Sequence, residues 1–251
     1  MPLQKTRVII LHRFPYSDSS FIVKAFSADF GILSFLLKGG KRKESPFKGA
    51  FDPMAYSEVV FQSSGKSEFV FAREASLLEW FPALRENLEA QAVAQVMAEL
   101  FLRYTPHGIS LSKEFELLLN AFTELNQEPA PELLSRWLFD LCAHWGFSLN
   151  LSRCSRCNQP FVQGPAEFLP DSGECVCVSC FTHHESLFEE DFLSDLWRFS
   201  KNEPVGSPEQ LEKTFLSYLR NHLGIKRNLN SVLWLDQIRK LKEKPCFPSA
   251  I

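Results

Sequence analysis

The stretch Ser20–Leu37, SFIVKAFSADFGILSFLL, decides the fold of the first part of the chain. Ser20–Ser27 and Ile32–Leu37 are both apolar and rich in β-branched or aromatic residues, so each predicts a strand. The four residues between them predict a turn, because Gly31 can adopt a positive φ without steric cost.

Three further strands are predicted around this pair. Arg7–His12 precedes it, and Met54–Gln62 and Glu68–Leu77 form a predicted hairpin around Ser63–Lys66. Five short strands within about 80 residues, with no helical pattern, favour a small closed barrel because closure removes exposed edges. The OB-fold is such a barrel, and its faces and loops often bind oligonucleotides.

The remainder of the chain has helical periodicity, and the junction is at Phe81–Pro82. We expect a Ser cap on the helix that begins at Ser112, a capping box at Ser207–Gln210, and a helix end at Gly224. The predicted helices are Leu84–Tyr104, Ser112–Asn126, Pro131–Trp145, Glu189–Phe199, Ser207–Leu223 and Ser231–Leu241. The fold class is therefore β then α, with an OB-fold domain at 1–80 and a helical domain at 81–251 that contains a zinc insertion at about 150–184.

Composition and charge limit the functional classes. The 251 residues are 45% hydrophobic and 23% charged, which is typical of a soluble globular protein. The sequence has neither a secretory signal nor an apolar run of about 18 residues, so we expect a cytoplasmic protein with no membrane partner and with reduced cysteines. The net charge is -3, yet residues 1–50 hold nine basic and three acidic side chains. Because the local field decides whether a polyanion is attracted, this basic segment remains a candidate DNA-binding region.

The basic residues concentrate in KGGKRKESPFK, Lys38–Lys48, between the third and fourth predicted strands. We expect its cations to contact phosphates and its glycines to allow close approach to DNA. The predicted DNA-binding residues are Lys38, Gly39, Gly40, Lys41, Arg42, Lys43 and Lys48. Phe14, Tyr16 and Phe47 are candidates for base stacking. The alternative is a solvated loop that serves only solubility.

Two cysteine pairs predict a zinc site. Cys154 and Cys157 are separated by two residues, as are Cys177 and Cys180, and nineteen residues lie between the pairs. Four thiolates would close a tetrahedral coordination sphere, so the zinc is expected to be structural. Cys177 is preferred as the third ligand because it completes the two-residue spacer with Cys180, and Cys175 is the alternative. His183 and His184 are expected at the surface instead of on the metal, Cys142 in the core and Cys246 free in the tail.

No catalytic set is recognisable in the sequence. It lacks the H-E-x-x-H, deaminase, G-x-S-x-G and Walker patterns, so we expect no enzyme activity. Two alternative functions remain open at this point. One is a zinc-stabilised protein-interaction adaptor without direct DNA binding, and the other is a zinc-dependent hydrolase or deaminase.

The order of these features resembles the RecO family of bacterial DNA repair proteins, which are recombination mediators. The stretch Val8–Ser45 is similar to the family's first strands and basic loop, with its Pro15–Tyr16 turn and Gly31. Further similar segments are Gly49–Pro53, Trp80–Arg85, the two Cys-x2-Cys pairs, Tyr218–Ile225 and Leu229–Ser231. The chain departs from the family at Asn230 and Val232, where basic residues commonly flank the Ser of the last motif.

The resemblance implies an OB-fold followed by a helical domain with a zinc module. It also implies binding to single- and double-stranded DNA, annealing of complementary strands, and help in loading the recombinase on protein-coated single strands. The implied partners are RecR, the single-stranded-DNA-binding protein and, indirectly, RecA. The implied location is the bacterial cytoplasm, in association with the nucleoid. We expect the acidic, apolar-tipped tail of the partner protein to bind near the basic C-terminal residues Arg220, Lys226, Arg227, Arg239 and Lys240. The alternative is that these cations only balance the C-terminal ends of helices.

Overall fold

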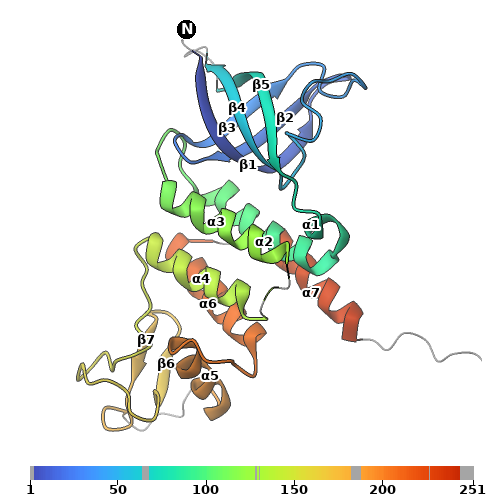
Figure 1. The fold of residues 1–251 in the computed structure, drawn as a ribbon. Helices are drawn as coiled ribbons and strands as arrows, with labels where there is room; N and C mark the ends of the chain where they lie inside the picture. The colour runs from blue at the N-terminus through green and yellow to red at the C-terminus, as the bar shows by residue number, and fades with distance from the viewer. Residues whose placement is uncertain are drawn as a thin grey trace, which may run out of the picture. The chain divides into compact units, whose positions relative to one another are not determined.

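The computed structural model describes residues 3–63, 68–127, 129, 131–181, 188–225 and 227–243. Its first part is a closed five-stranded barrel with strand order β1-β2-β3-β5-β4 (Figure 1). The strands are β1 (Gln4–Pro15), β2 (Phe21–Ser27), β3 (Gly31–Leu37), β4 (Tyr56–Ser63) and β5 (Val70–Glu79). β3 and β5 pair in parallel and all other neighbours are antiparallel, so the predicted OB-fold barrel is confirmed.

Alternating apolar residues fill the barrel. Val8 and Ile10 on β1, Phe35 on β3 and Phe61 on β4 are at most 1% exposed. The register of β1 against β2 shifts between Ile10 and His12, which marks a bulge in the longest strand. Such bulges let one long strand bend through two neighbouring faces of a barrel.

The helices belong to two compact units. Unit 1 comprises residues 1–129 and 228–251, and unit 2 comprises residues 130–227. Unit 1 adds to the barrel the helices α1 (Ala83–Glu86), α2 (Leu88–Tyr104), α3 (Ser112–Leu125) and α7 (Asn230–Glu243). Unit 2 contains α4 (Leu133–His144), β6 (Glu167–Leu169), β7 (Glu174–Val176), α5 (Glu190–Ser200) and α6 (Pro208–Leu223). The division of the chain into an OB-fold DNA-binding domain at 1–80 and a helical domain at 81–251 stays a prediction.

Three local expectations for the helices were wrong. The predicted helix Leu84–Tyr104 is broken at Asn87, whose extended backbone and side-chain oxygen cap α2 by accepting bonds from Glu89 N and Ala90 N. Ser112 does not cap α3, because its hydroxyl donates to the carbonyl of Ala28. Ser207 makes no side-chain cap on α6. Gly224, in contrast, ends α6 with φ 63°, as expected from the sequence.

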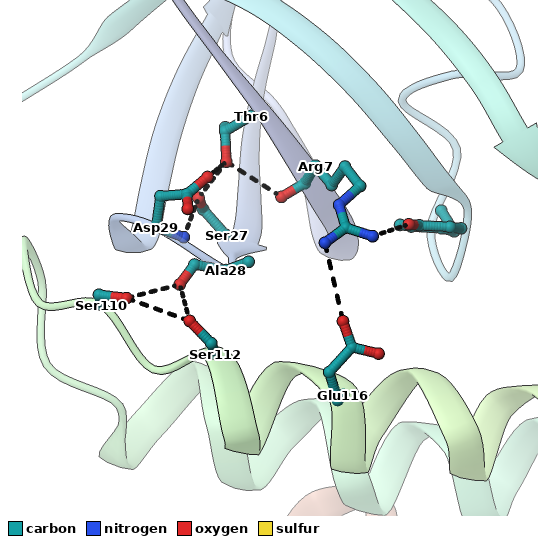
Figure 2. A network of polar contacts seen from close by, with 9 residues as sticks. Thr6, Arg7, Ser27, Ala28, Asp29, Ser110, Ser112 and Glu116 are labelled. Atoms are coloured by element: carbon teal, nitrogen blue, oxygen red, sulfur yellow. Dashed lines mark hydrogen bonds and ion pairs between the residues drawn. The ribbon is translucent and has the colours of Figure 1, made fainter.

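A polar seam and an aromatic cluster fasten the barrel to α2 and α3. Figure 2 shows Ser110 and Ser112 converging on the carbonyl of Ala28, and Arg7 of β1 facing Glu116 of α3 at 3.7 Å. Below the seam, the buried Phe26 ring stacks on Phe101 of α2 at 4.7 Å and lies 5.7 Å from Phe115 of α3. The barrel and these helices therefore share one core.

The chain returns to unit 1 through α7. The carboxylate of Glu99 on α2 accepts hydrogen bonds from Ser231 N at 2.8 Å and Ser231 Oγ at 2.5 Å, which satisfies donors at the start of α7. At the other end, Glu89 of α2 pairs with Arg239 and Lys242. These contacts orient α7 antiparallel to α2.

Within the described residues, no helix combines the length and the apolar composition needed to cross a membrane.

Candidate nucleic-acid interface and candidate metal centre

The basic loop, residues 38–48, is a series of turns anchored on the barrel. The N–H of Gly40 donates to Leu37 O and the N–H of Lys41 donates to Ser19 O at 3.0 Å. At the far end, the half-buried Phe47 ring meets Phe51 edge to face at 5.7 Å and packs against the barrel core. The loop is therefore held at both ends while its tip carries the charges.

The conformation and packing of the loop itself explain why glycine occupies positions 39 and 40. Gly39 has φ 71°, a conformation that L side chains rarely adopt. A Cβ at Gly40 would lie 3.2 Å from Leu37 and Phe21. The turn and its packing on the barrel thus account for both glycines, and close approach to DNA stays a prediction.

All five loop cations are exposed. Lys38 Nζ lies 5.8 Å from the Phe71 ring, and Lys41 Nζ donates to Ser17 O at 2.5 Å and lies 5.6 Å from the Phe21 ring. Arg42, Lys43 and Lys48 complete the exposed set. The predicted phosphate-contacting residues therefore share one accessible loop.

A hollow of about 400 Å³ lies at the base of the loop. Besides loop residues it is lined by Arg13 of β1, Phe21 of β2 and Asp52. Arg13 Nη1 pairs with Asp52 Oδ1 at 2.5 Å, and the Arg13 guanidinium lies 4.7 Å from the centre of the Phe21 ring. Sequence reasoning missed Arg13 and Phe21 as site residues because they come beside the loop only through the pairing of β1 with β2 and of β2 with β3.

The three candidate stacking residues have different environments. Phe14 is 41% exposed and contacts His12, and Tyr16 is 59% exposed. Phe47 is anchored against the core, although it also lines the hollow. Phe14 and Tyr16 therefore have more ring surface free for contact with a base.

The predicted partner-binding cations are divided between the two units. Arg220 and Arg227 lie in unit 2, whereas Arg239 and Lys240 lie in unit 1. Arg239 Nε is engaged by Glu89 at 3.1 Å. Lys226 lies outside the described residues.

The four predicted cysteines lie together in unit 2. The Sγ atoms of Cys154, Cys157, Cys177 and Cys180 are all within 4.8 Å of one another. Each pair sits in a tight turn, since Asn158 N donates to Cys154 O at 2.9 Å and Cys180 N donates to Cys177 O at 3.0 Å. Asn158 has φ 57°, which closes the first turn, and the short β6–β7 hairpin supports the second pair.

The spacing of the sulfurs fits a tetrahedral metal. Four thiolates at the usual zinc distance stand about 3.8 Å apart, and the Sγ atoms of Cys157 and Cys177 are 3.7 Å apart. Burial on its own raises the pKa of Cys154, but hydrogen bonds from the backbone N–H groups of Cys157, Cys177 and Arg156 together lower it by more. The pKa of Cys154 consequently falls to about 6. This donor set suits a metal that prefers thiolates.

The other cysteines are placed differently. Cys175 is fully buried on β7 and outside the group of four, and burial raises its pKa to about 12. Cys142 is buried on α4, in agreement with a core role. His183, His184 and Cys246 lie outside the described residues.

Comparisons with known proteins indicate the same family for both parts of the chain. Residues 1–81 match the family model described as Recombination protein O N terminal, and residues 85–230 match Recombination protein O C terminal. A DNA repair protein RecO of Dehalococcoides mccartyi is 22% identical over 94% of this chain and 96% of its own. The RecO of Anaeromyxobacter dehalogenans is 24% identical over 96% of this chain and 99% of its own, and that of Vibrio vulnificus is 33% identical over 61% and 62%.

Proposed function

Since the chain belongs to the RecO family of DNA repair proteins and has a role in recombinational repair, we propose that it binds and anneals single-stranded DNA. The observation that carries the proposal is the set of five exposed cations on one loop, held on an OB-fold barrel. Lys38, Gly39, Gly40, Lys41, Arg42, Lys43 and Lys48 form the DNA-binding site.

Phosphates are the natural ligands of this loop. Ammonium and guanidinium groups at a loop tip reach a DNA backbone more readily than base edges, so binding has little sequence preference. Cations that neutralise two strands at once reduce the repulsion between them, which is a physical route to annealing. Double-stranded DNA presents the same phosphates and binds to the same loop.

The remaining parts of the proposal concern zinc and proteins. One structural Zn²⁺ bound by Cys154, Cys157, Cys177 and Cys180 stabilises unit 2, and the protein has no enzymatic activity. RecR and the single-stranded-DNA-binding protein are direct partners, and RecA is loaded through them. The support for these partners is family membership.

A salt titration tests the DNA site. For single strands log K falls with log salt by about 0.7 per neutralised phosphate, so about four loop contacts contribute a slope of about -3. The triple variant Lys41→Ala, Arg42→Ala, Lys43→Ala should flatten the measured slope by about two. The matched control is Lys113→Ala, Arg198→Ala, Lys213→Ala, which removes the same side-chain types from exposed positions elsewhere.

The control variant should keep the wild-type slope, and both variants should melt near the wild-type temperature because exposed charges add little stability. An unaltered slope in the folded loop variant would assign the loop to solubility alone and favour the protein-interaction alternative.

A further inference from the structure

Four cations of unit 1 lie over aromatic rings, in a series that extends from the basic loop to the start of the helices. Their distances from the ring centres are 5.8 Å for Lys38 over Phe71, 5.6 Å for Lys41 over Phe21, 4.7 Å for Arg13 over Phe21 and 4.4 Å for Arg85 over Trp80. Alternation of cations with aromatic rings is the composition of surfaces that bind single strands.

Trp80 differs from the other rings in this series. Phe21 and Phe71 are half-buried in the barrel wall, whereas Trp80 is 42% exposed even though the Arg85 guanidinium lies over it. An indole is among the largest apolar side chains, and leaving this much of it in water has a cost that packing could have avoided.

Arg85 is a fixed support for the indole. Its guanidinium donates to the carbonyl oxygens of Trp80, Phe81 and Pro53, the last at 2.8 Å. Three backbone acceptors hold the group over one part of the ring. The ring is therefore rigidly presented, which lowers the entropy lost when a planar ligand stacks on it.

The Trp80–Arg85 pair adjoins the hollow at the base of the loop. Pro53, which Arg85 contacts, follows Asp52, and Asp52 lines the hollow together with Arg13, Lys41 and Lys48. A Cβ placed on Gly49, at the end of the loop, would lie 3.7 Å from Leu77 on β5, three residues before Trp80. A single strand with phosphates on the loop can therefore extend toward the indole.

We propose that Trp80, supported by Arg85, stacks one base of a single strand whose phosphates contact the basic loop. This inference rests on the proposed DNA binding. The contact is with a base and not with a phosphate, because the Arg85 guanidinium already donates to three backbone carbonyls and the nearby Asp52 carboxylate offsets its charge. Stacking tolerates any base, since every base has a π-face.

Two oligonucleotides of equal length distinguish base stacking from phosphate contacts. One is an oligothymidylate, and the other is an abasic strand with the same number of phosphates. With the full-length protein, Trp80→Ala should weaken binding to the oligothymidylate by about tenfold and leave binding to the abasic strand unchanged. The salt slope should stay at the wild-type value. Trp80→Phe should retain most of the affinity.

Leu78→Ala is the matched control, since Leu78 is 47% exposed at the end of the same strand. It should leave both affinities unchanged. Equal loss on both strands, or no loss in the folded Trp80→Ala protein, would overturn the stacking role. If Trp80→Ala has no effect while the loop variant still flattens the salt slope, only this inference fails. If the wild-type protein binds neither strand, the DNA-binding proposal fails with it.

Discussion

At the scale of single residues, burial distinguishes two cysteines that lie close together in the sequence. Cys175 and Cys177 are two positions apart, so both point to the same side of an ideal strand. Cys177 follows the end of β7 and enters the second turn, whereas Cys175 pairs with Phe168 and is fully buried. The backbone path, and not the thiol itself, places one sulfur in the cluster and the other in the core.

This difference gives a prediction for metal content. Cys154→Ser and Cys180→Ser should each lose the single zinc and destabilise unit 2, because three thiolates hold the ion far less tightly than four. Cys175→Ser should keep one zinc per chain in elemental analysis by mass spectrometry. Normal zinc in both ligand variants would contradict the site, and loss of zinc only in Cys175→Ser would show that Cys175 is the ligand.

At the scale of elements, the packing of α7 on α2 is secured by charges at both ends. Glu89 receives Arg239 and Lys242 at one end, and Glu99 receives the first N–H groups of α7 at the other. Partial burial on its own raises the pKa of Glu89, but hydrogen bonds from Lys242 and Arg239 offset this, so the pKa is lowered from its usual value of 4.5.

A lowered pKa means that ionised Glu89 stabilises the folded state above pH 4.5, and that this contribution is lost as the pH falls through the folded-state pKa. Glu89→Gln should therefore reduce the free energy of unfolding at pH 7 by at most about 1 kcal/mol, because the pair is partly exposed to solvent. In urea unfolding, the difference between variant and wild type should shrink steadily below pH 4.5.

Glu86→Gln, on the exposed surface of neighbouring α1, is the matched control and should change little at either pH. A Glu89→Gln deficit of the same size at pH 3 and at pH 7 would show that packing, and not charge, explains the loss.

At the scale of the whole molecule, unit 1 is discontinuous in sequence. The chain leaves it at residue 129 and returns at residue 228 to add α7. Leu229, Leu235 and Ile238 of this segment are buried, so residues that follow unit 2 in the sequence complete the core of the unit that contains the barrel.

Replacing core residues of α7 by alanine should therefore destabilise unit 1, although every barrel strand keeps its own residues. Leu235 is 2% exposed, and Leu235→Ala should cost about 2–5 kcal/mol of unfolding free energy. Leu233→Ala, the same change at a position 45% exposed, should cost less than about 1 kcal/mol. Hydrogen exchange of α2 amides measures the effect locally, and equal protection of α2 in both variants would contradict a shared core.

The sequence by itself determined the features that are encoded within a few neighbouring residues. Alternation and β-branching predicted the five strands, Gly31 and Gly224 predicted a turn and a helix end, and the paired Cys-x2-Cys spacing predicted the thiolate cluster. These signals survive without a partner because backbone conformation and ligand spacing are local properties. The cluster of cations in the basic loop was likewise visible in the sequence.

Only the tertiary structure decided which distant groups meet. Asn87 breaks a continuous helical pattern, and Ser112 gives its hydroxyl to Ala28 instead of its own helix. Arg13 reaches the basic loop through strand pairing, and Glu99 meets Ser231 across 132 residues. Such contacts leave no local pattern, because any exposed carboxylate or arginine has the same sequence signal whether or not a partner folds against it. The path of the chain in space, set by the closed barrel and by the return of α7, is the physical reason that these residues meet.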